Sequence, residues 1–228
     1  MQGKLIVFEG VEGSGKSTQL VRLQQWLGQN LLFQKLQVMG IVPALVVTRE
    51  PGGTTLGQSL RALLLNHQPD VAVGARAELL LYAADRAQHM EEIIRPALQA
   101  GSWVLCDRFI DSTVAYQGYG RGLSLSLIEQ LNEIATEGLA GDLTFWLQLD
   151  AAQGLNRSRT RGELDRMEQA SLAFHQQVQQ GFETLAEGHP ERIVPIHAAQ
   201  SEEAVAQAIQ IVMEQRLQTW YRQYLPVY

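Results

Sequence analysis

An eight-residue segment near the N-terminus constrains the fold of this chain most strongly. It reads Gly10-Val11-Glu12-Gly13-Ser14-Gly15-Lys16-Ser17 and matches the phosphate-binding pattern G-x-x-x-x-G-K-[ST]. The apolar run at residues 5–8 predicts a buried strand before it, and a helix is expected from Ser17 onward. A strand, a glycine-rich turn and a helix in this order let successive backbone N–H groups surround an anion. The segment therefore predicts a P-loop that binds a nucleoside triphosphate.

Two side chains of this loop have expected roles. Lys16 is expected to reach the β- and γ-phosphates, and the Ser17 hydroxyl is expected to ligate Mg²⁺. The pattern does not select one reaction, because GTPases, ATP-driven motors and small-molecule kinases all share it. The predicted ATP-binding residues of this region are Gly10, Val11, Glu12, Gly13, Ser14, Gly15, Lys16, Ser17 and Thr18.

Apolar segments alternate with helical patterns along the rest of the chain. Strands are expected at residues 5–8, 45–48, 103–106, 143–149 and 193–196. Further helices are expected at residues 56–65, 76–100, 125–136, 151–161, 168–187 and 201–221, while 29–43 fits either an extension of the first helix or a packed loop. Almost wholly apolar strands indicate a parallel sheet covered by helices on both faces. We expect an α/β, three-layer P-loop NTPase fold with five parallel strands, in one domain over residues 1–228.

Composition limits the compartment and the partners. The net charge is −6 and no basic run of five residues occurs, which argues against nucleic acid as the main partner. The single cysteine, Cys106, excludes an intrachain disulfide and fits a reducing compartment. No stretch approaches the roughly 18 apolar residues of a membrane span. A soluble cytoplasmic protein without a membrane or nucleic-acid partner is expected.

Polar residues follow the second and third predicted strands. These segments read Thr48-Arg49-Glu50-Pro51-Gly52-Gly53-Thr54 and Cys106-Asp107-Arg108-Phe109. The carboxyl ends of parallel strands face the ligand crevice, so Arg49 and Arg108 are expected there, where a planar guanidinium suits a phosphate. Asp107 ends an apolar strand and resembles a Walker B carboxylate that supports Mg²⁺.

The predicted helix at residues 76–100 carries another candidate pair. Tyr82 and Arg86 are four residues apart and share a helix face, which suits a base and a phosphate. The spacing fits equally well a core tyrosine and a solvated arginine. With Arg49 and Arg108, Arg86 would form a second anion site. A kinase whose acceptor carries a phosphate needs such a site, whereas a GTPase switch or a motor does not.

Taken together, these segments resemble bacterial thymidylate kinase. The resemblance extends from residue 4 to about residue 208 and includes the P-loop and the Thr48–Thr54 and Asp107-Arg108 segments. It also includes Tyr116-Gln117-Gly118 and Arg161-Gly162-Glu163-Leu164-Asp165-Arg166. It implies a nucleoside monophosphate kinase that converts dTMP to dTDP with ATP and Mg²⁺, a step in dTTP synthesis. It also implies a homodimer.

The resemblance implies roles for individual residues. Arg49 and Arg108 would bind the dTMP phosphate, Tyr82 would stack on thymine, and Arg86 would bond the carbonyl edge of the base. The predicted substrate-binding residues are Arg49, Tyr82, Arg86, Arg108, Ser112, Tyr116 and Gln117, of which Tyr116 and Gln117 would close around the sugar and base.

The same resemblance implies a lid over ATP at about residues 157–168. One type of this family has an arginine inside the P-loop, and the other supplies a basic residue from the lid. The loop interior here is Val-Glu-Gly-Ser, so the chain is similar to the second type. Arg161 is the first candidate for this residue and Arg166 the second, and Arg157 and Arg166 are expected to bind ATP. The predicted catalytic residues are Lys16, Arg108, Arg161 and Glu12, and the predicted metal ligands are Ser17 and Asp107.

Other functions fit parts of the sequence. One is a kinase of the same fold that acts on another nucleoside monophosphate, and another is a P-loop switch that controls a partner. A motor on nucleic acid is disfavoured by the acidic charge and small size. Two segments depart from the family pattern: residues 29–43 are longer than usual, and the aromatic tail at about 220–228 would pack on the body or on a partner subunit.

Overall fold

Five strands form one parallel sheet in the computed structural model, which describes residues 3–66, 73–162 and 165–224, without the side chain of Arg161. They are β1 (Leu5–Glu9), β2 (Leu45–Arg49), β3 (Trp103–Asp107), β4 (Leu143–Gln148) and β5 (Ile193–His197). Their order is β2-β3-β1-β4-β5, and each neighbouring pair is parallel. The predicted five-stranded parallel sheet is confirmed. Each strand ends within one residue of its expected position.

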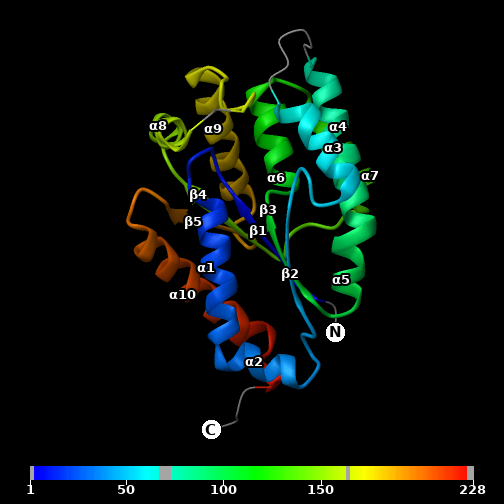
Figure 1. Cartoon of the computed structure of the whole chain (residues 1–228), viewed down its shortest axis with the longest axis vertical. Coiled ribbons are helices and arrows are strands. Elements are labelled where there is room, and N and C mark those ends of the chain that lie inside the picture. The colour runs from blue at the N-terminus through cyan, green and yellow to red at the C-terminus, as the bar shows by residue number, and fades with distance from the viewer. Residues whose placement is uncertain (1–2, 67–72, 163–164, 225–228) are drawn as a thin grey trace.

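Helices cover both faces of this sheet (Figure 1). The α-helices are α1 (Lys16–Gln29), α2 (Leu31–Val38), α3 (Thr55–Leu65), α4 (Ala75–His89), α5 (Arg95–Gln99), α6 (Ile110–Thr113), α7 (Leu125–Thr136), α8 (Ala151–Arg161), α9 (Leu172–Gly188) and α10 (Glu202–Trp220). Two π-helical turns, η1 (Met90–Ile94) and η2 (Val114–Gly120), and a 3₁₀ turn, η3 (Arg222–Tyr224), complete the described elements.

Strand β1 shows why helices are needed on both sides. Leu5 and Val7 pack into one apolar cluster with residues of η1 and α5, whereas Ile6 and Phe8 pack into a larger cluster with α1, α9 and α10. All four side chains are fully buried. Successive residues of a strand point to opposite faces, so an apolar residue at every position requires a cover on each face. The predicted α/β three-layer fold is confirmed.

Two helical segments differ from the prediction. Residues 76–100 form α4, η1 and α5 rather than one regular helix. Pro96 stands at the start of α5 and cannot donate a backbone hydrogen bond, and the turn before it widens into a π-helix. Residues 110–120 are helical although no helix is predicted there.

Segment 29–43 forms neither an extension of the first helix nor a packed loop. A new helix, α2, starts after Asn30, whose side chain accepts a 3.0 Å hydrogen bond from the Phe33 amide. An asparagine at this position satisfies an otherwise unpaired N–H group of the first turn. Phe33 and Leu36 then bury one face of α2 against the core.

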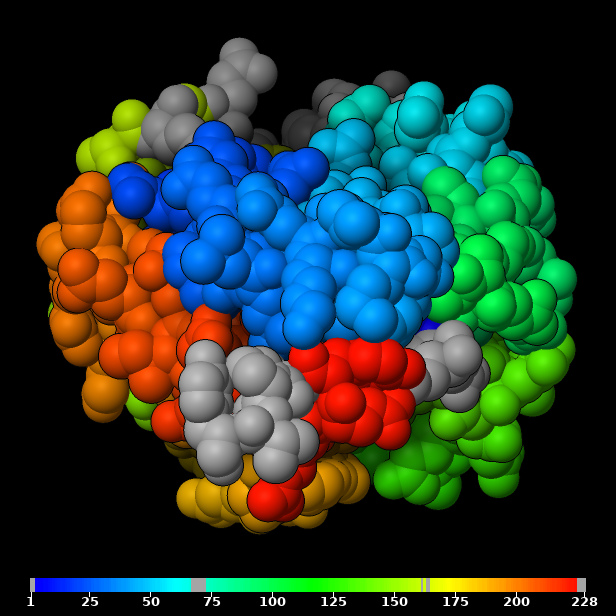
Figure 2. Space-filling model, turned by 90° about the horizontal axis from the view of Figure 1, so that it is seen from below, coloured from blue at the N-terminus to red at the C-terminus, as the bar shows by residue number. Residues whose placement is uncertain are grey.

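The described part of the aromatic tail packs on the body of its own chain. Trp103 Nε1 donates a 2.8 Å hydrogen bond to Tyr221 Oη, and the Trp103 and Trp220 rings meet edge to face at 5.5 Å. Lys35 of α2 donates to the carbonyl oxygen of Tyr224. Figure 2 shows α2, in blue, beside the red C-terminal residues on this face. Within residues 3–66, 73–162 and 165–224, no helix is both long and apolar enough to cross a membrane.

Candidate active site

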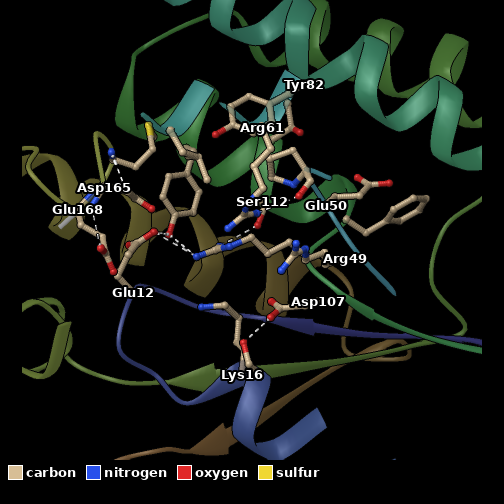
Figure 3. A pocket seen from close by; sticks show the side chains of 18 of the residues that line it. Glu12, Lys16, Arg49, Glu50, Arg61, Tyr82, Asp107, Ser112, Asp165 and Glu168 are labelled. Carbon is tan, nitrogen blue, oxygen red and sulfur yellow. Dashed lines mark hydrogen bonds and ion pairs between the residues drawn. The ribbon is translucent and has the colours of Figure 1, made fainter. Parts of the chain in front are cut away.

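A cavity of about 220 Å³ lies at the carboxyl ends of β1, β2 and β3. Parallel α/β sheets place their ligand crevices at this edge. Figure 3 shows side chains from the P-loop, β2, β3, α3 and α4 around it. Of the predicted residues, the structure brings together Glu12, Gly13, Lys16, Ser17, Arg49, Tyr82, Arg86, Asp107, Arg108, Ser112, Tyr116 and Gln117 in its walls. Gly10, Val11, Ser14, Gly15, Thr18, Arg157 and Arg166 do not line it.

The P-loop forms as predicted between β1 and α1. Gly13 has a φ of 67°, and a β-carbon there would lie 2.2 Å from the carbonyl oxygen of Gly154. Only glycine fits both this left-handed conformation and this close approach. Gly15, with φ of 92°, caps α1, whose first N–H groups are therefore directed at the loop interior.

The Lys16 ammonium group lies over the loop. Nζ donates to the carbonyl oxygens of Gly10, at 3.0 Å, and Val11, at 2.9 Å. The side chain is buried and still contributes to the cavity wall. Burial, assisted by the positive charge of Arg108, lowers the pKa of Lys16 to about 8. A negatively charged ligand would further stabilise the charged form of this lysine.

Ser17 and Asp107 meet at the base of the cavity. Ser17 Oγ donates a 2.8 Å hydrogen bond to Asp107 Oδ2, and both residues line the cavity (Figure 3). Asp107 reaches this position because β3 pairs with β1, with Asp107 opposite Phe8. Hydroxyl and carboxylate oxygens are the donors that a small divalent cation prefers. The structure describes no cluster of three or more His, Cys, Asp or Glu side chains suited to a metal ion.

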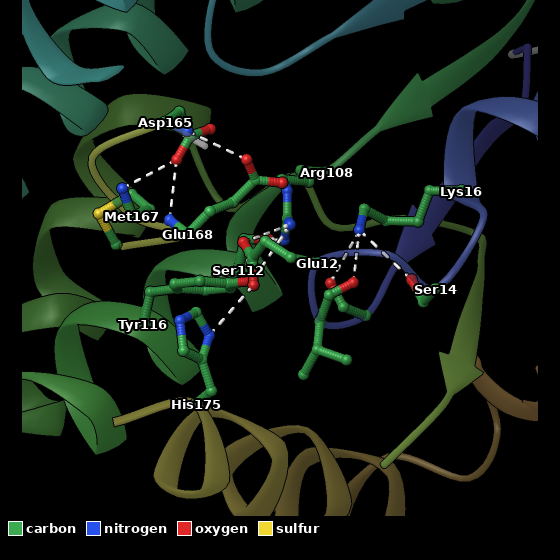
Figure 4. Close-up of polar contacts among 12 residues, drawn as sticks. Glu12, Ser14, Lys16, Arg108, Ser112, Tyr116, Asp165, Met167, Glu168 and His175 are labelled. Carbon is green, nitrogen blue, oxygen red and sulfur yellow. Dashed lines mark hydrogen bonds and ion pairs between the residues drawn. The ribbon is translucent and has the colours of Figure 1, made fainter. Parts of the chain in front are cut away.

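Arg108 and Glu12 form an ion pair in the cavity wall. Arg108 Nη2 lies 3.1 Å from both Glu12 Oε1 and the Tyr116 hydroxyl, and Nη1 donates to Ser112 Oγ at 3.0 Å (Figure 4). Tyr116 Oη also donates to Glu12 Oε1 at 2.6 Å. Arg108 has a φ of 70°, which is uncommon for a residue with a β-carbon, and this turn directs its side chain along the sheet edge.

Glu12 is ionised in this setting. Burial by itself would raise the pKa of its carboxyl group, but His175, Arg108, Lys16 and Tyr116 together lower it below the ordinary value. The nearest His175 atom is Nδ1, 3.3 Å from Glu12 Oε2. The P-loop, the end of β3, η2 and α9 thus meet at one carboxylate (Figure 4).

Glu9 is a site residue that the sequence pattern does not single out. It is fully buried and accepts hydrogen bonds from the Phe109 amide at 2.8 Å and from Ser112 Oγ at 2.6 Å. Burial raises its pKa to about 7, against the lowering effect of Arg108. Glu9 thereby fixes Ser112, which in turn accepts from Arg108. A charged residue at the end of an apolar strand is the one sequence signal that could have found it.

Arg86 is buried rather than solvated, so that alternative is wrong. Its Nε donates to Glu50 Oε2 at 2.8 Å, and its Nη2 donates to the Phe109 carbonyl oxygen at 3.0 Å. Its Nη1 donates to Thr113 and Asn132 at 2.8 Å each. The guanidinium therefore braces the cavity wall that it lines.

Tyr82 lies on the same helix and lines the cavity rather than the core. Burial, with the nearby charge of Glu78, raises the pKa of its phenol above the ordinary value. The ring is therefore neutral at physiological pH. A neutral aromatic ring in a cavity wall is suited to stacking on a flat base.

A second group of unpredicted residues anchors the segment that follows β2. Glu50 Oε1 lies 2.9 Å from His89 Nδ1, and His89 Nε2 lies 2.6 Å from Thr48 Oγ1. Asp85 accepts from the Gly52 amide at 3.0 Å. These contacts hold the segment against α4. Arg61 of α3 donates to the Pro51 carbonyl oxygen and adds a cation to the cavity wall beside Arg49.

The lid residues Arg157 and Arg166 do not line the cavity, whereas Lys16 and Arg108 do. Arg166 donates to Glu78 Oε2 at 2.5 Å and to the Leu64 carbonyl oxygen at 2.7 Å. Glu78 is buried and also accepts hydrogen bonds from Gln117 and Arg121. It therefore competes with a bound ATP for the Arg166 guanidinium. Arg157 donates to the Ala198 carbonyl oxygen.

Lid residues other than the arginines line the cavity: Asp165, Met167 and Glu168. Residues 163–164 and the Arg161 side chain lie outside the described part of the chain. The roles expected of Arg157, Arg161 and Arg166 therefore stay predictions.

Comparison with known proteins agrees with this geometry. A protein-family model described as thymidylate kinase matches residues 8–209. The chain is 58% identical to a thymidylate kinase of Cyanothece sp. (strain PCC 7425 / ATCC 29141), with 98% of each chain covered, and 53% identical to one of Acaryochloris marina, covering 97% of this chain and 100% of that one. A crystal structure of thymidylate kinase from Ehrlichia chaffeensis has 34% identity and a TM-score of 0.72, covering 93% of this chain and 100% of that one. The chain belongs to the thymidylate kinase family.

Proposed function

We propose that this protein transfers the γ-phosphoryl group of ATP to dTMP and releases dTDP and ADP, a step toward dTTP. A bond forms between an oxygen of the dTMP phosphate and the γ-phosphorus, and the bond from that phosphorus to the β-phosphate of ATP breaks. One observation carries the proposal: Lys16 of the P-loop shares one cavity with Arg49 and Arg108. A triphosphate site and a second anion site therefore lie within reach of each other.

The protein residues act by positioning and by charge. Arg49 and Arg108 hold the acceptor phosphate, whose oxygens are already ionised, so no strong general base is needed. Lys16 stabilises the charge that spreads over the transferred group. Glu12 holds Arg108 through the 3.1 Å ion pair and faces the acceptor sugar or phosphate.

The base of dTMP lies between residues of α4 and η2. Tyr82 stacks on thymine, Arg86 faces its carbonyl edge, and Gln117 closes the pocket. Gln117 Nε2 donates to the buried Glu78 at 2.8 Å, and this contact fixes the orientation of its amide. Ser112 and Tyr116, both bonded to Arg108, line the same wall.

The remaining cavity elements serve ATP. Backbone N–H groups of residues 10–18 surround its phosphates, and Ser17 and Asp107 would hold Mg²⁺. When bound, Mg²⁺ neutralises charge on the phosphate oxygens. The lid at about residues 157–168 covers ATP, with Arg157 and Arg166 as binding residues and Arg161 near the transferred group. Lid closure excludes water and so limits ATP hydrolysis.

The homodimer is part of the proposal. Leu63 of α3, Leu80 of α4 and Ile134 of α7 are 52%, 56% and 75% exposed, and these helices lie side by side (Figure 1). Large exposed apolar residues on neighbouring helices favour a protein interface. Light scattering of the wild type and of Leu80→Lys tests this interface. A dimer that Leu80→Lys turns into a monomer is expected, and a monomeric wild type contradicts the homodimer.

A coupled assay tests the function. ADP release is measured with MgATP and each of dTMP, dUMP, CMP, AMP and GMP, and the product is identified by mass. Turnover is expected with dTMP above all, with dTDP as the product. Preference for another monophosphate would identify a different kinase of the same fold. Slow ATP hydrolysis without any phosphorylated nucleotide would identify a switch protein instead.

A further inference from the structure

His175 is buried beside the cavity with unsatisfied hydrogen-bonding groups. It lies on α9 and is 1% exposed. Within the described part of the chain, neither of its ring nitrogens has a hydrogen-bond partner. A buried polar group without a partner is costly, so such a group calls for an explanation.

Glu12 has an unsatisfied acceptor that matches His175. Its Oε1 accepts from the Tyr116 hydroxyl at 2.6 Å and from Arg108 at 3.1 Å. Its Oε2 is buried and, among the described residues, has no hydrogen bond. An ionised carboxylate is stabilised by donors on both oxygens.

The two unsatisfied groups face each other. His175 Nδ1 and Glu12 Oε2 are 3.3 Å apart, within ion-pair distance (Figure 4). A carboxylate only accepts hydrogen bonds, so this pair is favourable only with the proton on Nδ1. Either the neutral Nδ1–H form or the imidazolium satisfies that condition.

We infer that His175 is a positioning residue whose protonated Nδ1 pairs with Glu12 Oε2, 3.3 Å away, as the donor that this oxygen lacks, and thereby orients Arg108. The inference rests on the proposed function, in which Arg108 holds the acceptor phosphate. Without this donor, only Oε1 of the Glu12 carboxylate is held, by Tyr116 and Arg108, and the carboxylate can rotate about that oxygen. The guanidinium that Glu12 pairs with then loses its fixed position toward the phosphate.

Packing alone makes a different prediction. Phenylalanine fills the space of the imidazole ring without its nitrogens. Asparagine carries an amide nitrogen close to the place of Nδ1, and glutamine carries one close to the place of Nε2. A purely structural role would favour His175→Phe over both amides, whereas a donor at Nδ1 favours His175→Asn over the other two.

Steady-state kinetics of the three variants separate these roles. His175→Phe and His175→Gln are expected to lower kcat/KM for dTMP about tenfold, the scale of one hydrogen bond to a charged group, with KM for ATP less affected. His175→Asn is expected to stay within about threefold of wild type. Equal activity of the Asn and Phe variants, or a Gln variant as active as the Asn variant, would overturn the inference.

Val178→Ala is the matched control. Val178 is fully buried on the same helix, one turn further on. Its truncation is expected to lower Tm while kcat/KM for dTMP changes less than about twofold. If this control lost as much activity as His175→Phe at a similar Tm, the effect at His175 would be structural and the inference would fail.

The protonation site of His175 gives a test that does not depend on activity. In ¹⁵N-histidine-labelled protein, long-range ¹H–¹⁵N spectra distinguish the two ring nitrogens, and the His175→Asn spectrum identifies the resonance among the five histidines. A protonated Nδ1 is expected in the wild type, and the Nε2–H tautomer would overturn the inference. Failure of the proposed function would appear separately, as a wild-type protein that does not phosphorylate dTMP.

Discussion

The Ser17 hydroxyl donates a 2.8 Å hydrogen bond to the Asp107 carboxylate, although 90 residues separate them in the chain. Ser17 is the last residue of the P-loop and lies in the first turn of α1, and Asp107 ends β3. The pairing of β1 with β3 brings the two elements together. This contact joins the triphosphate loop to the end of β3, which Arg108 follows directly.

Replacing Asp107 tests this junction. Asp107→Asn keeps the shape of the side chain but removes the negative charge that supports Mg²⁺ in the proposal. We expect the activity at low Mg²⁺ to fall at least about tenfold and partly recover as Mg²⁺ is raised. The check is a Mg²⁺ titration of initial rates. Asp142→Asn, which removes a carboxylate paired with Lys4, is the control. If Asp107→Asn and Asp142→Asn gave the same Mg²⁺ titration curve, the proposed role of Asp107 would be contradicted.

Replacing Arg108 tests the acceptor site. Arg108→Ala removes the guanidinium that Glu12 and Ser112 hold in place. We expect kcat/KM for dTMP to fall by about a hundredfold or more, and Lys16→Ala to cause a loss of the same order. Arg108→Lys restores charge without the planar fork and should recover only part of the loss. Near-normal turnover of the Arg108→Ala variant would rule out its role.

Glu9 should make stability depend on pH. Its pKa is about 7 in the folded protein against an ordinary value of 4.5, so between these values the folded state binds more protons than the unfolded state. The stability that Glu9 contributes is therefore complete below about pH 4.5 and is lost as pH rises through 7. Glu9→Gln imitates the protonated form and removes this dependence.

Chemical denaturation of both proteins at several pH values measures the effect. The stability of Glu9→Gln relative to wild type should rise with pH between about 5 and 7, by at most about 1.4 kcal/mol per pH unit. Glu129→Gln, on the exposed face of α7, corrects for the removal of one carboxylate. A constant difference between Glu9→Gln and wild type over this range would show that the Glu9 pKa is not raised.

The hydrogen bond between Trp103 and Tyr221 should contribute measurably to the free energy of unfolding. Tyr221→Phe leaves Trp103 Nε1 buried without its acceptor, and we expect a loss of about 1–3 kcal/mol in the free energy of unfolding. Tyr224→Phe, on the neighbouring turn, should change it by less than about 0.5 kcal/mol. Urea denaturation of the two variants decides the point. Equal stability of both variants would mean that the Trp103–Tyr221 hydrogen bond contributes nothing.

Much of the fold follows from local sequence. The strand at residues 5–8, the glycines of the P-loop and the start of α1 require only neighbouring residues to specify their conformation. The helical irregularities are harder to predict. Asn30 could have been recognised as a helix cap, but the π-helical turn before Pro96 depends on how the flanking helix packs.

Site residues at the ends of strands could be predicted from the sequence, whereas the partners of buried charged residues could not. Arg49, Asp107 and Arg108 line the cavity because parallel strands end at one edge. The same rule says nothing about Glu9, because a partner such as Ser112 lies 103 residues away. Nor does it say that Arg86 bonds to Glu50 rather than to water.

The amino-acid sequence was enough to predict the P-loop at residues 10–17, the parallel α/β sheet, the family and the set of polar residues at the sheet edge. These features depend on periodicity, glycine geometry and the alternation of strands and helices along the chain, which are encoded locally. Only the three-dimensional packing shows which partner each buried carboxylate has: Glu9 bonds with Ser112, Glu78 with Arg166, and Glu12 with Arg108 beside His175. Each pair joins segments far apart in the chain, and only packing fixes the distance and the desolvation on which its energy depends.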